Sequence, residues 1–412
     1  MFDVNKVRGD FPMFQNNPDL IYFDNAATTL KPQPVIDAVT DFYTKHTSNV
    51  HRGDYGIAVT NDRLYDGARK SFARLIHCEP DEIAYTHNVT QSLNEVAYAM
   101  QHTFLKPGDV VLTTKAEHAS CLLPWFRMEK EYGIRVEYIP TDGEARISID
   151  DFKKALHPGV KAVCVAQMTN VLGSVQPIRE MTKAAHAAGA YMIVDGAQSV
   201  PHLPVDVKDL DVDFLCFSVH KMCGPSGVGI LYGKKELLDR MDPQMLGGDM
   251  NARFEDDGSM ILKETPVKFE AGTPNIEGVI GAAAAADYLL SLGMENIEAY
   301  EMELRKYFCE KMQKLENVVL YNPDNVHGPI DFNVKDPKSG KMIFAQDAAG
   351  YLAAKNVAVR SGNHCAKILH HIIGTDQTVR ASLYFYNTKE EVDRAVQVIS
   401  EVSLENAVGI FF

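Results

Sequence analysis

Short apolar runs alternate with helical patterns along the first half of the chain. Helical patterns cover residues 32–46, 63–76, 90–104 and 178–190, and the last of these ends at Gly189. Strand-like runs stand between and after them, at residues 81–86, 109–114, 135–141, 161–167, 191–197, 213–220 and 227–233. Because strands interleaved with helices are typical of βαβ units, the pattern predicts an α/β fold whose largely parallel sheet is covered on both faces.

In the second half of the chain, strand-like and helical patterns no longer alternate regularly. Residues 247–275 are polar and rich in turn formers, which predicts an excursion or an interface arm, and a long helix is expected to begin directly after them. Beyond about residue 288, helical patterns at 296–315 and 388–402 mix with strand-like runs at 318–323, 328–334, 357–362 and 378–386. The helix at 388–402 starts with a capping box formed by Thr388 and Glu391. We expect a second, smaller α+β domain, in keeping with a chain of 412 residues.

Composition and charge narrow the class of protein. The chain is 46% hydrophobic and 23% charged, as soluble globular proteins are, and its formal net charge is −14. This charge, without any Lys/Arg-rich run, argues against nucleic acid as a partner. Residues 1–14 contain no apolar signal-peptide core, and no apolar stretch approaches the length of a membrane span. We therefore expect a cytoplasmic protein with no membrane partner.

Seven cysteines are present, and no CxxC pair occurs among them. Neither a disulfide framework nor a zinc ribbon is expected from this pattern. Cys164 and Cys216 stand in apolar strand-like runs and are interpreted as core residues. Cys365, in the polar segment RSGNHCAK, could by itself be a buried filler, a metal ligand or a nucleophile. Zinc is disfavoured, because adjacent His364 and Cys365 fit one tetrahedral site poorly, so no metal site is expected.

Polar side chains gather where predicted strands end. In open α/β sheets, ligands bind beyond the carboxyl ends of the strands. The residues placed there are Asp195, Gln198, Ser218, His220, Lys221 and His118, with Val89, Thr90 and Gln91 at a helix start suited to a phosphate. Pyridoxal phosphate needs a lysine for its Schiff base and an acid for its pyridinium nitrogen, so Lys221 and Asp195 fit this cofactor. No GxGxxG follows a strand, which disfavours a dinucleotide fold.

Motifs along nearly the whole chain resemble one family. They are YFDNAATT (22–29), NVHRG (49–53), TNVLGS (169–174), VDGAQS (194–199), SVHKMCGPSGVGILYG (218–233), FEAGTPN (269–275), RSGNHCA (360–366) and RASLYFYNTKEEVD (380–393). In this order they resemble the class V aminotransferase family of fold-type I pyridoxal-phosphate enzymes, specifically the SufS-type cysteine desulfurases. The resemblance implies a large domain (18–287) with a mainly parallel seven-stranded sheet between helices. It also implies a small α+β domain (288–412) that carries the catalytic cysteine loop, and an N-terminal segment (1–17) that packs with the small domain.

The resemblance also implies roles for individual residues. Lys221 would form the Schiff base and move the Cα proton, and the Cys365 thiolate would take sulfur from L-cysteine as a persulfide, releasing alanine. Around the cofactor ring, Asp195 would contact the ring nitrogen, Gln198 the ring hydroxyl, and His118 would stack on the ring. The phosphate would be held by Thr90, Ser218, His220 and a partner subunit's Thr273, with Val89 and Gln91 also at this end of the cofactor. The implied substrate contacts are Asn170 and Arg380 to the carboxylate, with Arg360 and Ala27 nearby.

Two departures and several alternatives accompany the resemblance. Asn363 replaces the first of two histidines that often precede the cysteine, and the run KILHHIIGTDQ after it differs from the usual apolar stretch. Selenocysteine lyase and cysteine-sulfinate desulfinase activities remain open on the same scaffold, and a non-catalytic metal-binding protein is a remote alternative. Implied partners are a second copy of the chain and a sulfur acceptor of SufE or SufU type, for iron–sulfur cluster assembly.

Overall fold

The apolar runs of the first half form one seven-stranded sheet in the computed structural model, which describes residues 3–409. Its order is β2-β8-β7-β6-β5-β3-β4. The strands are β2 (Ile83–Thr86), β3 (Val110–Thr113), β4 (Arg135–Tyr138), β5 (Val160–Ala166), β6 (Tyr191–Asp195), β7 (Phe214–Ser218) and β8 (Gly229–Gly233). All neighbours are parallel except β8, which is antiparallel to β2 and β7. The predicted α/β fold with a mainly parallel sheet is confirmed.

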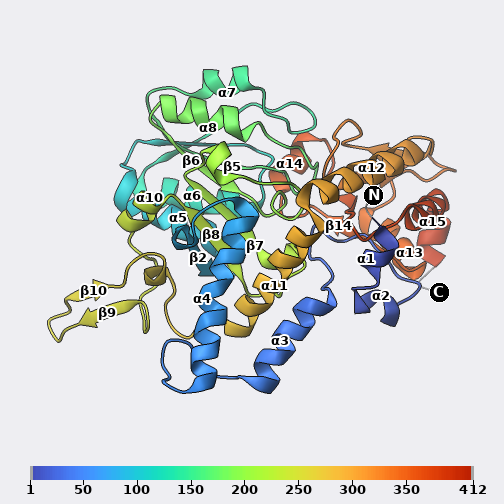
Figure 1. Cartoon of the computed structure of the whole chain (residues 1–412). Helices are drawn as coiled ribbons and strands as arrows, with labels where there is room; N and C mark the ends of the chain where they lie inside the picture. Colours follow the sequence, from blue (N-terminus) through green and yellow to red (C-terminus); the bar gives the residue numbers. More distant parts are fainter. Residues whose placement is uncertain (1–2, 410–412) are drawn as a thin grey trace.

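Helices cover both faces of this sheet (Figure 1). One face carries α3 (Gln33–Lys45), α4 (Gly56–Ile76), α7 (Ile149–Ala155), α8 (Ile178–Ala187), α9 (Val207–Leu210) and α11 (Ile276–Leu292). The other carries α5 (Val89–Ala99), α6 (Ala119–Tyr132) and α10 (Lys235–Arg240). Side chains alternate along β5: Val163 and Val165 pack on the first face, whereas Ala162 and Cys164 pack on the second. From Ala162 onwards the strand is thus buried on both sides, which explains its apolar sequence from that residue to Ala166.

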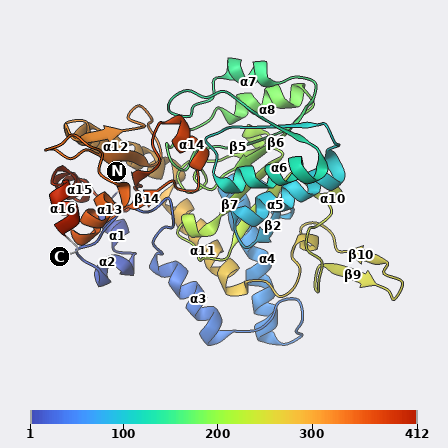
Figure 2. The same ribbon diagram turned by 180° about the vertical axis from the view of Figure 1, so that it is seen from behind.

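A second, four-stranded antiparallel sheet lies beside the large one, in the order β11-β12-β15-β14. Its strands are β11 (Val318–Leu320), β12 (Ile330–Val334), β14 (Arg360–Gly362) and β15 (Thr378–Ala381). The helices around it are α12 (Met294–Met312), α13 (Ala345–Ala354), α14 (Lys367–Ile372), α15 (Lys389–Ser400) and α16 (Leu404–Gly409). This sheet has its own core, centred on Phe308, Phe332 and Leu352. In both views α14 lies between the two sheets (Figure 2).

The N-terminal residues pack against the second sheet and its helices. Helices α1 (Val4–Arg8) and α2 (Pro12–Asn16) precede β1 (Ile21–Tyr22), which pairs in parallel with β13 (Val357–Ala358). Arg8 lies 3.0 Å from a carboxylate oxygen of Glu391 on α15, and the rings of Phe11 and Tyr386 meet edge to face at 4.7 Å. Residues 1–2 and 410–412, which the predicted segments 1–17 and 288–412 include, lie outside the described residues.

Two further segments follow the predicted pattern, and one predicted strand is shorter than expected. Residues 247–275 contain a hairpin, β9 (Asn251–Phe254) and β10 (Met260–Leu262), that projects from the body (Figures 1 and 2). The long helix predicted after residue 275 is α11, which ends before Gly293, where φ is +83°, and the helix predicted at 296–315 is α12. The predicted strand at 378–386 is wrong beyond Ala381, because Tyr384 and Tyr386 turn into a buried aromatic cluster. Taken singly, no helix within residues 3–409 is long and apolar enough to cross a membrane; only α11 and α12, bent by 74°, meet that criterion as a pair.

Candidate active site

A cavity of about 250 Å³ lies where the two sheets meet. Its walls come from the segments that follow β1, β2, β3, β5 and β7, from β14 and β15, and from the segment between β14 and α14. Most of the predicted site residues line it: Ala27, Val89, Thr90, His118, Asn170, Ser218, His220, Lys221, Arg360, Cys365 and Arg380, together with Ala26, Asn88 and His364. The strand ends of the large sheet thus meet residues from the small sheet in one place, as the strand-end rule predicts.

Lys221 and Asp195 stand at the ends of neighbouring strands. Lys221 closes the short turn Val219–Lys221 after β7, and Asp195, the last residue of β6, is only 4% exposed. Burial raises the pKa of Asp195, against a 2.9 Å hydrogen bond from the Ala197 N–H and the charge of Lys221. Burial lowers the pKa of Lys221 to about 8, opposed by Asp195 and assisted by Arg380. A lysine with this pKa is partly neutral near pH 7, so it can serve as a nucleophile and as a base.

The N-terminus of α5 forms one end of the cavity. Asn88 caps it, since its Oδ1 accepts a 3.0 Å hydrogen bond from the Gln91 N–H. Ser218 Oγ accepts a 2.8 Å bond from the Val89 N–H, which ties the helix to β7. Gly229 on β8 permits this packing, because a Cβ there would lie 2.5 Å from the Asn88 carbonyl carbon. The positive end of the helix dipole, with hydroxyl groups beside it, suits a phosphate.

His118 and His220 are both neutral imidazoles. Burial lowers the pKa of each to about 4, and the nearby Lys221 charge adds to the effect. His118 caps α6, where its Nδ1 accepts a 3.1 Å hydrogen bond from the Ser120 N–H. In a neutral ring whose Nδ1 accepts, the proton lies on Nε2. His118 therefore offers one N–H donor and no charge.

Arg380 and Asn170 form the opposite end, suited to a carboxylate. Arg380 is 2% exposed, and its Nη1 donates a 2.8 Å hydrogen bond to the Asn170 backbone oxygen. Within the described part of the chain, Arg380 Nε is buried without a hydrogen-bond partner, so its N–H remains available to donate to a carboxylate. Asp24, which the sequence reading did not single out within the motif YFDNAATT, lies 3.7 Å from Arg380 Nη2. Burial lowers the pKa of Arg380 to about 10, so it remains a cation at neutral pH.

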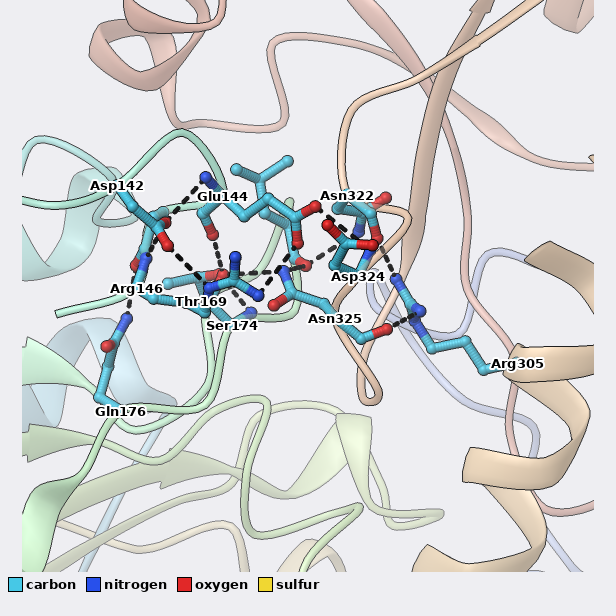
Figure 3. Close-up of polar contacts among 12 residues, drawn as sticks. Asp142, Glu144, Arg146, Thr169, Ser174, Gln176, Arg305, Asn322, Asp324 and Asn325 are labelled. Atoms are coloured by element: carbon cyan, nitrogen blue, oxygen red, sulfur yellow. Dashed lines mark hydrogen bonds and ion pairs between the residues drawn. The ribbon is translucent and has the colours of Figure 1, made fainter. Parts of the chain in front are cut away.

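A polar network fixes the loop that carries Asn170 (Figure 3). Asn322 and Asn325 each donate from Nδ2 to the Leu172 carbonyl of this loop, at 2.9 and 2.7 Å. The buried Arg305 donates in turn to the backbone oxygens of Asn322 and Asn325. Gly173, with φ +68°, is required here, because a Cβ would lie 2.4 Å from the His327 carbonyl oxygen. The loop that carries Asn170 is therefore held against the segment between β11 and β12 of the second sheet.

Cys365 presents its thiol at the mouth of the cavity. It is exposed, whereas the other six cysteines are buried. Its backbone oxygen accepts a 2.8 Å hydrogen bond from the Ala119 N–H, which follows His118. The Asn170 Nδ2 group donates a 2.8 Å bond to the carbonyl of the preceding residue, His364. These contacts join the cysteine loop to the start of α6 and to the loop that carries Asn170.

Four predicted residues lie outside the cavity lining. Asp195 and Gln198 are buried beneath it, and Gln198 Nε2 donates a 2.9 Å hydrogen bond to the Ala26 carbonyl oxygen. Gln91 and Thr273 line a separate pocket at the base of the β9–β10 hairpin. Among residues 3–409, no three His, Cys, Asp or Glu side chains are placed to hold a metal ion.

Comparisons with known proteins agree with this geometry. The chain matches the family described as aminotransferase class-V over residues 21–395. It is 39% identical to a cysteine desulfurase of Haloferax volcanii, over 96% of each chain. The apo structure of a cysteine desulfurase from Thermococcus onnurineus superposes with a TM-score of 0.91 at 39% identity, covering 96% of this chain and 97% of that one. The cysteine desulfurase CsdA of Escherichia coli gives a TM-score of 0.89 at 33% identity, covering 100% and 99%. The chain belongs to the class-V aminotransferase family, and within it to the cysteine desulfurases.

Proposed function

We propose that this cavity converts L-cysteine to L-alanine and that Cys365 receives the sulfur as a persulfide. The observation that carries the proposal is that an exposed thiol, a partly neutral buried lysine and a buried arginine line the same cavity. Incubation with L-cysteine and a reductant, with alanine and sulfide measured together, tests it. Parallel reactions with selenocysteine and cysteine sulfinate distinguish a desulfurase from a lyase or desulfinase.

The donor set fits pyridoxal phosphate. A buried carboxylate stands one strand away from the lysine, and a capped helix start with hydroxyl groups lies at the other end of the cavity. When bound, the cofactor supplies an electron-withdrawing ring that stabilises negative charge at the substrate Cα. The residues that would hold it are Lys221 by covalent attachment, Asp195 at the ring nitrogen, Gln198 at the ring hydroxyl, His118 against the ring, and Thr90, Ser218 and His220 with Val89 around the phosphate. Gln91 belongs to the same helix start but lines the separate pocket.

The chain's own residues supply binding, proton transfer and the nucleophile. Arg380 and Asn170 bind the substrate carboxylate, Ala27 and Arg360 border it, and Lys221 moves the Cα proton. The Cys365 thiolate attacks the substrate sulfur, so that an S–S bond forms, the C–S bond breaks and its electron pair leaves with the carbon fragment. That fragment takes up protons, one of them from Lys221 or His118. L-Cysteine and a thiol thus give L-alanine and a persulfide, balanced in atoms and electrons.

The rate at which the cofactor attaches is expected to rise as Lys221 loses its proton. Only the neutral amine is a nucleophile, and burial lowers the pKa of Lys221 to about 8. The rate of appearance of the visible cofactor band, measured after adding pyridoxal phosphate to the apoprotein, should rise with pH and level off above about pH 8. A rate that keeps rising towards pH 10 would indicate an ordinary exposed lysine.

Arg380→Lys is expected to raise KM for L-cysteine about tenfold or more, because an ammonium group cannot reproduce the bidentate fork of a guanidinium. The visible band of the bound cofactor should remain, since Arg380 lies at the opposite end from α5. Arg127→Lys is the matched control, because that side chain is 73% exposed on α6. An unchanged KM in the Arg380 variant would remove the carboxylate assignment.

We propose a homodimer of SufS type in which Thr273 reaches the phosphate of the neighbouring subunit. Thr273 lies away from its own cavity, and the nearby hairpin exposes apolar side chains, with Phe254 73% and Ile261 60% exposed. Phe254→Glu with Ile261→Glu should shift the sedimentation coefficient from dimer towards monomer. A wild-type monomer with full activity would contradict the proposal.

We also propose that the persulfide passes to an acceptor protein of SufE or SufU type in the cytoplasm, for iron–sulfur cluster assembly. The support is the exposure of Cys365 and the short connection from it through α14 to β15, which keeps the thiol close to the cavity mouth. Adding each acceptor to the persulfidated enzyme should move the sulfur to the acceptor and raise the rate of alanine formation.

A further inference from the structure

A cluster of four buried polar side chains lies directly behind the cysteine loop. Asp331 comes from β12, Thr378 from β15, His364 from the loop and His370 from α14. All four side chains are buried; His364 is 4% exposed and the other three 0%. No step described above uses Asp331, Thr378 or His370. His370 belongs to the run KILHHIIGTDQ, which departs from the apolar stretch expected after the cysteine.

Thr378 is the centre of this cluster. Its Oγ1 lies 2.7 Å from Asp331 Oδ1, 3.1 Å from His364 Nε2 and 3.2 Å from His370 Nε2. A hydroxyl has one proton and two lone pairs, so it donates once and accepts twice. All three contacts can be hydrogen bonds only if one neighbour accepts and the other two donate.

The remaining contacts decide which neighbour accepts. His370 Nδ1 lies 3.1 Å from the Ala366 carbonyl oxygen, so Nδ1 carries a proton. If His370 is neutral, its Nε2 has no proton and must accept the hydrogen bond from the Thr378 hydroxyl. The Thr378 oxygen then accepts from His364 Nε2 and from Asp331, and Asp331 can donate only if it is protonated. If Asp331 is ionised instead, His370 has to be an imidazolium ion. Either arrangement contains one proton more than a carboxylate with two neutral rings.

The neutral arrangement costs less in a buried site. Asp331 Oδ2 and His364 Nδ1 have no hydrogen-bond partner among residues 3–409. An ionised carboxylate with an unpaired oxygen is more expensive to bury than a protonated one. Burial also raises the pKa of Asp331 to about 8, although Thr378 and Arg380 act in the opposite direction. Burial lowers the pKa of His364 and His370, so both rings are neutral near pH 7.

The cysteine loop needs such support because its backbone is strained. His364 and Cys365 have φ values of +50° and +58°, so two successive residues with side chains adopt the left-handed conformation. For a residue with a side chain this conformation is sterically unfavourable, and it persists only where its surroundings impose it. The Asn170 and Ala119 bonds hold the backbone of this turn. The cluster holds the His364 side chain, and therefore the direction from which Cys365 enters the cavity.

We propose that Asp331, Thr378 and His370 are positioning residues for Cys365, and that they hold His364 through a hydrogen-bond pattern that requires a protonated Asp331. This inference rests on the proposed function and deepens it. The three residues do not contact the substrate or the reacting sulfur. They keep a strained turn in the one conformation from which the thiol reaches the substrate.

Thr378→Val and Thr378→Ser are the central pair of variants, tested as holoenzymes. Valine has the shape of threonine without the hydroxyl, whereas serine keeps the hydroxyl. We expect Thr378→Val to slow persulfide formation on Cys365 about 10²-fold in a single turnover with L-cysteine, as misplacement of a reacting group by about 1 Å does. Thr378→Ser should retain most of the wild-type rate.

A second readout separates positioning from general damage. Exchange of the Cα proton of L-alanine in heavy water uses Lys221, Asn170 and Arg380 but not Cys365, so it should be unchanged in Thr378→Val. Equal loss of exchange and of persulfide formation would mean a structural defect, and equal retention of both would mean no role; either overturns the inference. Failure of the wild type to form alanine would instead overturn the proposed function.

Asp331→Asn tests whether the hydrogen-bond pattern requires a proton on Asp331. An asparagine amide can donate to Thr378 as a protonated carboxyl does, so this variant should keep the wild-type rate at pH 7, whereas Asp331→Leu should be as slow as Thr378→Val. Above about pH 8 the wild type should slow relative to Asp331→Asn, since Asp331 then loses its proton. Arg380, Arg360 and His371 also face the cluster and are unchanged in this comparison. Equal slowness of the Asn and Leu variants would overturn the protonated pattern.

Discussion

Cys365→Ala is expected to abolish sulfide and persulfide formation from L-cysteine, with a loss of about 10³-fold or more, while the visible band of the bound cofactor is retained. Cys365 is exposed at the cavity mouth, and the other six cysteines are buried. No other thiol of the chain can therefore reach a sulfur atom held over Lys221. The cofactor contacts assigned to Asp195, Ser218 and α5 do not involve this side chain.

Cys78→Ala is the matched control for this variant. Cys78 is a buried thiol that lies outside the cavity, and burial raises its pKa, so it stays a thiol at neutral pH. The control should desulfurate L-cysteine at the wild-type rate. Unchanged sulfide production by Cys365→Ala would mean that the sulfur leaves without this nucleophile, as it would in a lyase.

Lys221→Ala is expected to remove the visible band of the covalently attached cofactor and to lower the rate of alanine formation by about 10²–10⁴-fold. Two functions are lost together, because the same amine attaches the cofactor and moves the Cα proton. Pyridoxal phosphate should still bind non-covalently, since the donors at the α5 end and Asp195 remain in place.

Lys235→Ala provides the comparison, because Lys235 lies on α10 and pairs with Asp239, outside the cavity. Its absorbance spectrum should be that of the wild type. An unaltered visible band in Lys221→Ala would assign the attachment to a different lysine and would remove the central residue of the site.

The pattern of apolar and polar residues within each segment predicts the large sheet of this protein well. The strands β5, β6 and β7 are largely apolar, because both of their faces are buried, and β6 and β7 end at the polar residues Asp195 and Ser218. Parallel strands end at one edge of a sheet, so Asp195, Ser218 and Lys221 come together without any knowledge of long-range contacts. The residues of the second sheet, Arg360, Cys365 and Arg380, could be added only through the family resemblance.

The remaining features depend on contacts between distant segments. Asp24 faces Arg380 because the N-terminal segment pairs with residues more than three hundred positions later: β1 with β13, and Asp24 itself with Ser382. Asp331, Thr378 and His370 lie in separate segments of the sequence, each among apolar residues. The sequence of any one segment therefore gives no sign that the three side chains are in contact. Their grouping depends on the pairing of β12 with β15 and on the direction in which α14 packs. Side-chain patterns within one segment contain no signal for such pairings.

The most direct test of this account is the mass of the Cys365 peptide after the holoenzyme reacts with one equivalent of L-cysteine in the absence of an acceptor. We expect this peptide alone to gain the mass of one sulfur atom, with one alanine released per sulfur gained, and to lose that mass on treatment with a reductant. Alanine release without added sulfur on Cys365, or added sulfur on a different cysteine, would contradict the proposed role of Cys365.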